Sequence, residues 1–103
     1  MKNPIADLHK AFESRIRLGI MAALAAGDAL EFNALKELLD VTDGNLASHL
    51  KGLEKESFIS VSKSFVGRKP NTKYAMTKKG RKAFEDHLLA LEQLIATRRH
   101  PGT

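Results

Sequence analysis

The spacing of apolar residues changes after Ser57, and this change restricts the possible folds more than any other feature of the chain. Before Ser57, apolar residues recur every three or four positions, which is the spacing of one face of an α-helix. After it, apolar and polar residues alternate through 59–65 and again through 74–76, as they do in half-buried strands. A turn cluster at 67–71 separates the two stretches. The pattern predicts a helical region followed by one β-hairpin, with residues 68–70 at its tip and an inward face of Ile59, Val61 and Phe65.

Helices are predicted on both sides of the hairpin, and each begins near a residue that suits a helix N-terminus. Their ranges are 4–12, 15–26, 34–39, 43–56 and 78–98, and the predicted caps are Asn3, Ser14, Asn33, Thr42 and Thr77. Within 34–39, the residues expected to face inward are Leu35, Leu38 and Leu39. Residues 29–32 are too few for an independent strand and are expected to add a third edge to the sheet. Gly19, inside a largely apolar helix, is expected to mark close packing against a neighbouring helix.

The helix predicted over 43–56 has two contrasting faces. Leu46, Leu50 and Leu53 form a narrow apolar stripe, while the opposite face is small, polar and basic. A turn of three residues, 40–42, joins this helix to the preceding one, which is typical of a helix-turn-helix motif. Short polar side chains beside lysines suit a helix that lies in the major groove of DNA. Taken alone, this face fits an ordinary solvated surface equally well.

Length and composition indicate one globular domain. The chain has 103 residues, of which 43% are hydrophobic and 28% charged, and we expect a single domain over 1–103 with its core over 15–77. No apolar run approaches the roughly 20 residues that span a bilayer, and the first residues lack the apolar region of a signal peptide. Cysteine is absent, which fits a reducing compartment and removes thiolate metal ligands and redox switching. We therefore expect a cytoplasmic protein with no role at a membrane.

The positive charge is concentrated in one part of the chain. Residues 1–62 hold seven Lys/Arg against nine Asp/Glu, whereas residues 63–82 hold eight Lys/Arg and no acid. The formal net charge of +5 therefore arises from a local +8 segment. A patch of this size is expected to bind a polyanion, and double-stranded DNA is the leading candidate. An anionic membrane fits less well, because the segment alternates like a strand and lacks an apolar helical face.

Three stretches carry a resemblance to a known family. They are Thr42-Asp43-Gly44-Asn45-Leu46-Ala47-Ser48-His49-Leu50, Phe65-Val66-Gly67-Arg68-Lys69-Pro70 and Tyr74-Ala75-Met76-Thr77-Lys78-Lys79-Gly80-Arg81. In this order of elements, the chain closely resembles the small stand-alone winged helix-turn-helix regulators of the MarR/ArsR-like group in prokaryotes, over roughly 15–95. The resemblance implies a mainly α (α+β) winged-helix fold with a two- to three-stranded antiparallel sheet. It also implies a homodimeric transcriptional regulator, with a recognition helix at 43–56 in the major groove and a wing at 63–73 on the backbone or minor groove.

The candidate DNA-contacting residues lie on the recognition helix and the wing. They are Thr42, Gly44, Asn45, Ser48, His49, Lys51, Lys55, Lys63, Arg68, Lys69 and Lys73. Asn and Ser can bond base edges, whereas lysines more often neutralise phosphates. His49 lies at the edge of the apolar stripe, so packing in the core and base contact are both open. Arg17 occupies a position where the family pattern often has an Arg that is structural or faces phosphate. Gly52 stands where that pattern has a second basic residue after Lys51, which predicts weaker DNA binding by the helix over 43–56.

Apolar residues near both ends of the chain predict a homodimer. Together, the helices expected over 4–12 and 78–98 offer more apolar surface than one compact domain needs. The interface candidates are Ile5, Leu8, Phe12, Phe84, Leu88, Leu91 and Ile95. A two-fold dimer would place its recognition helices one helical turn apart, about 34–36 Å, and would bind a palindromic operator.

Other kinds of site have little support in the sequence. The histidines at 9, 49, 87 and 100 lack the spacing of metal ligands, and Asp86-His87 is an isolated pair. No nucleophile–base pair, phosphate-binding Gly loop or group of converging carboxylates occurs, so we expect no catalytic residue, metal or cofactor. A small-molecule effector stays open, because similar regulators answer to ligands at the dimer interface. The alternative function is a winged-helix module that binds an acidic protein partner.

Overall fold

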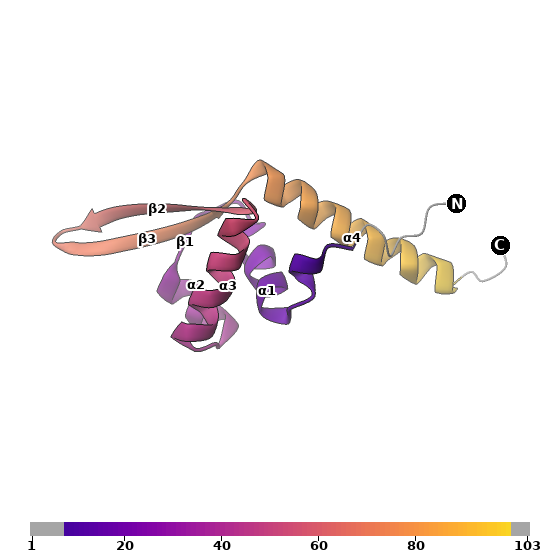
Figure 1. The fold of residues 1–103 in the computed structure, drawn as a ribbon, viewed down its shortest axis with the longest axis horizontal. Coiled ribbons are helices and arrows are strands. Elements are labelled where there is room, and N and C mark those ends of the chain that lie inside the picture. Colours follow the sequence, from indigo (N-terminus) through magenta and orange to yellow (C-terminus); the bar gives the residue numbers. More distant parts are fainter. Residues whose placement is uncertain (1–7, 100–103) are drawn as a thin grey trace.

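The structure, a computed structural model, describes the backbone of residues 8–99 and the side chains of residues 8–96. Its elements are the 3-10 turn η2 (Lys10–Phe12), α1 (Arg15–Leu24), β1 (Leu30–Glu31), α2 (Phe32–Leu39), α3 (Asp43–Lys55), β2 (Ile59–Val66), β3 (Lys69–Met76) and α4 (Lys78–Arg99). Helices α1, α2 and α3 form a small body, from which the β2–β3 hairpin and α4 extend in opposite directions (Figure 1). The molecule is therefore elongated, with extents of 62 × 25 × 21 Å.

The three strands form one antiparallel sheet in the order β1-β3-β2. β2 and β3 are paired from Ile59↔Met76 out to Val66↔Lys69, so a two-residue turn closes the hairpin. Gly67, in this turn, has a φ of 65°, a left-handed conformation that glycine adopts without steric cost. β1 pairs with the inner part of β3, Leu30↔Tyr74 and Glu31↔Lys73, which confirms the predicted third edge of the sheet.

The core lies where α1, α2 and α3 meet the root of the hairpin. Seven large side chains are almost completely buried there: Ile20, Met21, Leu24, Leu35, Leu46, Leu50 and Leu53. The apolar stripe predicted for α3 supplies three of them, which confirms its orientation. Gly19 of α1 also fulfils its prediction, because a Cβ there would lie 3.0 Å from Cδ2 of Leu39 in α2.

Hydroxyl side chains cap the N-termini of three helices, as predicted. The hydroxyl oxygens of Ser14, Thr42 and Thr77 accept from the backbone N–H groups of the third helical residues, Arg17, Asn45 and Gly80. Thr77 also donates its hydroxyl to the carbonyl oxygen of Ser57, at 2.7 Å. The same side chain therefore caps α4 and ties it to the connection between α3 and β2.

Several local expectations are wrong. α2 begins at Phe32 directly after β1, so Asn33 lies inside the helix and Glu31 occupies the cap position without a side-chain hydrogen bond. Leu38 is 64% exposed, because its position on α2 turns away from the face that buries Leu35. Phe65 is also exposed, since the hairpin extends past the helices that bury Ile59. The predicted tip 68–70 is in fact a turn at 67–68, with Lys69 and Pro70 already paired in β3.

Residues 4–7 of the predicted helix over 4–12 lie outside the described residues, which begin at Leu8. In the described part, Leu8 and His9 are not helical and only Lys10–Phe12 form a 3-10 turn. α4 is far longer, with 22 residues. Among residues 8–99, no helix is long and apolar enough to cross a membrane.

Candidate nucleic-acid interface

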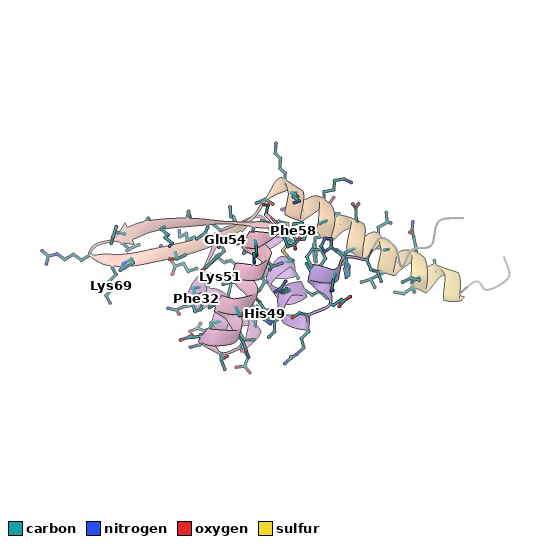
Figure 2. The ribbon with its side chains drawn as sticks, in the orientation of Figure 1. Phe32, His49, Lys51, Glu54, Phe58 and Lys69 are labelled. Atoms are coloured by element: carbon teal, nitrogen blue, oxygen red, sulfur yellow. The ribbon has the colours of Figure 1, made fainter. Side chains whose placement is uncertain are left out.

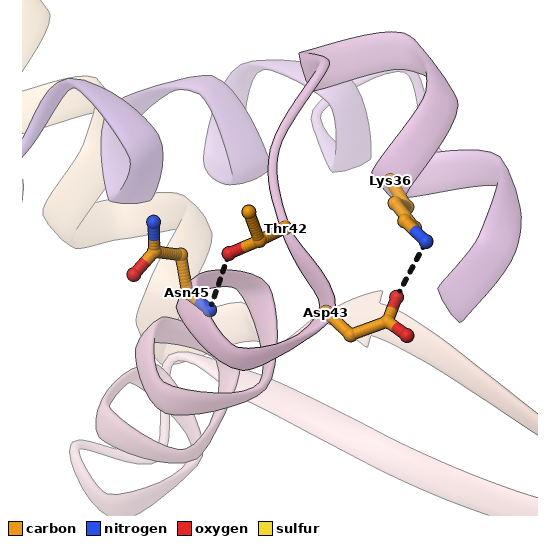
Figure 3. Close-up of polar contacts among 4 residues, drawn as sticks. All are labelled: Lys36, Thr42, Asp43 and Asn45. Atoms are coloured by element: carbon orange, nitrogen blue, oxygen red, sulfur yellow. Dashed lines mark hydrogen bonds and ion pairs between the residues drawn. The ribbon is translucent and has the colours of Figure 1, made fainter.

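The connection between α2 and α3 is fixed by polar contacts at both sides (Figure 3). Asp40 ends α2 in the left-handed conformation, and its N–H donates to the carbonyl of Lys36. The Nζ atom of Lys36 then forms an ion pair with Oδ1 of Asp43 in the first turn of α3, at 2.8 Å. Asp43 also lies at the positive end of the α3 dipole, which favours its carboxylate. These contacts hold the two helices in one relative orientation, which a helix-turn-helix needs in order to present its second helix.

The outer face of α3 is exposed and lacks partners within the chain. Asn45, Ser48, Lys51 and Lys55 are all exposed. Within the part of the chain that the structure describes, their side chains form no hydrogen bond or ion pair. Thr42 and Gly44 lie at the exposed start of the same helix. The donors and acceptors of this face are therefore free to bind another molecule.

His49 lies at the flank of α3 that faces α1, one turn after Asn45 and beside the exposed face (Figure 2). Its Nδ1 atom accepts a hydrogen bond from Nε of Arg17, at 3.1 Å, and the imidazole is half-buried. Burial, and then the neighbouring guanidinium, lower the pKa of His49 below its ordinary value. Of the two roles left open for this residue, the structure supports packing within the chain.

Gly52 makes room for the same guanidinium. A Cβ at Gly52 would collide with the Nη atoms of Arg17 and would lie 2.6 Å from its Cζ. Arg17 therefore crosses from α1 to the flank of α3, and a larger residue at 52 would displace it. The sequence contained a signal for this contact, a glycine in the middle of a helix, where it costs about 1 kcal/mol relative to alanine. It did not reveal which side chain fills the space.

The hairpin carries the remaining basic candidates, and the strand register separates them by face. Lys63 is on the face of Ile59 and Val61, whereas Lys69 and Lys73 are on the opposite face. Lys73 is also opposite Glu31 of β1 in the register of the sheet. Arg68 and Lys69 are at the exposed end of the hairpin, where Figure 2 shows Lys69.

Part of the +8 segment is engaged within the chain. At the start of α4, Arg81 donates from both Nη atoms to the carbonyl of Ala25, at 3.5 Å, and Nζ of Lys82 pairs with Oδ2 of Asp86 at 3.3 Å. Nζ of Lys79 lies 5.7 Å from the ring centre of Phe58. Arg81 and Lys79 thus contact residues outside α4, while Lys82 pairs within α4, so the free positive charge is concentrated on the hairpin and α3.

The predicted interface residues divide between the core and the surface. Phe12 and Phe84 are 3% and 7% exposed, with ring centres 5.9 Å apart, and so belong to the core of this chain. The buried imidazole of His87 packs on Phe12, and its Nδ1 atom accepts from the N–H of His9. On α4, Leu88 and Ile95 are exposed and Leu91 is half-buried. Leu8, which precedes η2, is also half-buried. Ile5 lies outside the described residues.

A cavity of about 510 Å³ lies between the N-terminal segment, α1 and the inner side of α3. Its charged lining is balanced, with Lys10 and Arg17 against Glu13 and Glu56. In the described residues, no cluster of three or more His, Cys, Asp or Glu side chains could hold a metal ion. Nothing in this lining forms a nucleophile–base pair.

The geometry defines a class of protein. A rigid helix-turn-helix with a free polar face on its second helix, followed by a basic hairpin, is a winged helix-turn-helix domain. Residues 16–95 match the family described as the winged helix DNA-binding domain, and the chain belongs to that family. The family is described by DNA binding and not by a catalytic activity.

Individual proteins agree with this assignment. The uncharacterized protein MJ0432 of Methanocaldococcus jannaschii is 42% identical over 85 residues, which cover 82% of this chain and 92% of the relative. A transcriptional regulator homologue from Pyrococcus horikoshii OT3 is 30% identical, with a TM-score of 0.73, and the match covers 84% of this chain and 91% of that one. A MarR-family regulator from Silicibacter pomeroyi shares the fold at 19% identity and a TM-score of 0.67, over 97% and 66% of the two chains. The predicted resemblance to MarR-like winged-helix regulators is confirmed.

Proposed function

We propose that the protein is a sequence-specific transcriptional regulator that binds double-stranded DNA as a homodimer at a palindromic operator. One observation carries the proposal: a free polar face on a rigidly held helix stands beside a hairpin that has no acidic residue. The solved structures of similar fold include a PadR protein from Bacillus subtilis in complex with operator DNA.

The α3 face divides into two kinds of contact. Asn45 and Ser48 carry short hydrogen-bonding groups that can read base edges in the major groove. Lys51 and Lys55 follow on the same exposed face and would neutralise phosphates. Thr42 and Gly44 bring the start of the helix close to the backbone, where the helix dipole also favours phosphate. His49 stands at the edge of this contact set, because its Nδ1 atom accepts from Arg17 and only Nε2–H is left to donate to DNA.

The wing contributes cations at a distance from α3. Arg68 and Lys69 at the end of the hairpin would contact the backbone or the minor groove beside the major-groove site. Lys63 and Lys73 would add charge along the two faces of the hairpin. Because these side chains are exposed and lack partners among the described residues, they can contact phosphates without first breaking an internal contact.

Dimerisation would use the part of α4 that extends beyond the body. Leu88, Leu89 and Ile95 are 40%, 52% and 58% exposed, which is unusual for three large apolar residues on one helix. Leu8 and Leu91 would border this surface. Because Phe12 and Phe84 are already buried within the chain, the proposed interface contains fewer residues than the sequence predicted.

Selection of binding sites from a random duplex library, followed by electrophoretic mobility shifts, tests the DNA-binding part. We expect a recovered palindrome, and loss of binding when Lys51, Lys55, Arg68 and Lys69 are all changed to alanine. A control with Lys78→Ala and Lys82→Ala removes positive charge from α4 outside the proposed surface and is expected to retain binding. Unchanged binding by the fourfold variant would refute this contact surface. If fragmented genomic DNA gives no shift, an acidic protein partner becomes the better explanation of the basic surface.

Chromatography with light scattering tests the dimer separately. We expect twice the 11.4 kDa mass of the chain at micromolar concentration. The double variant Leu88→Ser and Ile95→Ser is expected to be monomeric, whereas Leu38→Ser, which changes a still more exposed leucine on α2, should stay dimeric. A monomeric wild-type protein would rule out the two-fold arrangement and the palindrome it requires.

A further inference from the structure

The end of the hairpin carries apolar side chains that the fold does not use. Phe65 is 73% exposed and Val66 is 65% exposed, the highest values for large apolar residues in the described part of the chain. They are consecutive in β2, so they point to opposite faces of the hairpin. Phe65 is opposite Pro70 in the register, and Val66 is opposite Lys69. One face of the hairpin end is therefore apolar across both strands.

The chain itself leaves this end uncovered. β1 pairs with β3 only as far as Lys73, and the hairpin continues for four further residue pairs, about 13 Å, as a two-stranded ribbon. Every residue from Ser62 to Pro70 is exposed. Figure 1 shows this ribbon projecting away from the helical body. Phe65 thus contributes nothing to the core and is available to a partner outside the chain.

Charge identifies the chemistry of that partner. No Asp or Glu occurs between Glu56 and Glu85, and Arg68 and Lys69 stand beside the apolar pair. The partner must be anionic and must also offer an apolar surface. The minor groove of DNA has both, with phosphates along its edges and deoxyribose and base faces inside. It is about 6 Å wide, so it admits side chains from a hairpin end but not the whole ribbon.

We propose that Phe65, supported by Pro70, is an apolar wedge that enters the minor groove and partly unstacks a base step beside the operator half-site. The proposal rests on the proposed function, because it concerns how the wing of that regulator holds its DNA. Phe and Pro are among the side chains that act in this way in minor-groove binders, and the insertion kinks the duplex. Pyrimidine–purine steps unstack most easily, so the wedge would favour such a step at one position that no hydrogen bond reads.

The test uses the full chain and a selected operator duplex of about 30 base pairs, labelled at its ends for energy transfer. Affinity and end-to-end transfer are measured for the wild type, Phe65→Ser, Phe65→Leu and Val66→Ser. We expect Phe65→Ser to bind about ten-fold more weakly and to leave the duplex unbent, on the scale of aromatic–base stacking. Phe65→Leu should keep the bend, because leucine is also a wedge residue. Val66→Ser, a neighbour of similar exposure on the other face, should stay within two-fold of the wild type.

Other results would overturn the wedge. One is that Phe65→Ser binds and bends the operator as the wild type does. Another is that Val66→Ser loses as much affinity as Phe65→Ser. A change in the mass of Phe65→Ser without DNA would show that a second copy of the chain covers Phe65. The proposed function fails separately, if the wild type selects no sequence from the library; a wild type that selects an operator and loses nothing with Phe65→Ser removes only the wedge.

Discussion

Replacing Gly80 by alanine is expected to lower the free energy of unfolding by about 3 kcal/mol. A Cβ at this position would overlap the carbonyl oxygen of Phe58 and lie 2.8 Å from its carbonyl carbon. That carbonyl accepts a hydrogen bond from the N–H of Thr77 at 3.1 Å, and Phe58 itself is buried, so neither side can yield cheaply. Overpacking against backbone costs up to about 3 kcal/mol and the strained hydrogen bond about 1 kcal/mol, while alanine returns about 1 kcal/mol of helix propensity.

The same substitution at Gly52 is expected to change the stability by less than about 1 kcal/mol. There the new Cβ meets the guanidinium of Arg17, which is the far end of a flexible side chain and can move into solvent. The loss is the hydrogen bond from Arg17 to His49, about 1 kcal/mol, and the gain in helix propensity is of the same size. The pKa of His49 should also rise toward its ordinary value, because the guanidinium that helps to lower it would be gone.

Thermal unfolding followed by circular dichroism, at one protein concentration, compares the two variants. A loss of about 3 kcal/mol corresponds to a fall of about 12–24 °C in Tm for a domain of this size. Gly80→Ala should therefore melt far below the wild type, and Gly52→Ala within a few degrees of it. Gly44→Ala, where a Cβ meets nothing within 4 Å, controls for helix propensity and should not destabilise. Equal losses at positions 52 and 80 would show that Arg17 is held rigidly and would refute the reasoning.

Three further predictions concern salt, pH and capping. If the six cations of α3 and the wing meet phosphates, a plot of the logarithm of the association constant against the logarithm of the salt concentration should have a slope of about −5 per protomer. Lys63→Ala should reduce the magnitude of this slope by about 0.9. Lys73→Ala should reduce it by less, because Lys73 is opposite Glu31 of β1 in the sheet. Burial, and then the neighbouring His9, lower the pKa of His87. The unfolded chain therefore takes up the proton first, and the stability of the fold should fall as the pH drops below about 6.5. The Tm of His87→Asn should depend less on pH than that of the wild type, and an equal dependence would contradict this assignment. Thr77→Ala should cost about 2 kcal/mol in denaturant unfolding, since it removes the cap of α4 and a second hydrogen bond, whereas Thr77→Ser should retain most of the stability.

Features determined by neighbouring residues could be predicted from the sequence. The caps at Ser14, Thr42 and Thr77 depend on a side chain and a backbone N–H three residues away, and all three are present. The order of helices, strands and the tight turn follows from the apolar spacing and needs no tertiary information. The free polar face of α3 was visible for the same reason, because the stripe of leucines defines its opposite side.

Features that depend on the extent of the core could not be predicted. Strand alternation assigned Phe65 correctly to the face of Ile59 and Val61, but it contains no information on where the helices stop, and Phe65 lies exposed beyond them. Leu38 and Leu39 are consecutive in a helix of eight residues, so the pattern could not decide which of them turns inward. The separation of Lys63 from Lys73 follows from the register of β2 and β3, which depends on a two-residue turn at 67–68, where the sequence had predicted a three-residue tip at 68–70.

Gly52 shows how a contact between distant residues can reverse the meaning of a local signal. In the sequence, Gly52 indicated a missing cation on the recognition helix and therefore predicted weaker DNA binding by that helix. In the structure the absent side chain admits the guanidinium of Arg17, which comes from 35 positions earlier and brings a positive charge to the flank of α3. Arg17 of α1 thus supplies a positive charge beside α3, and its Nε atom donates one hydrogen bond to Nδ1 of His49. That bond occupies Nε alone, and the Nη atoms of Arg17 lie over Gly52, so the pair of His49 and Gly52 positions a cation that α3 itself does not encode.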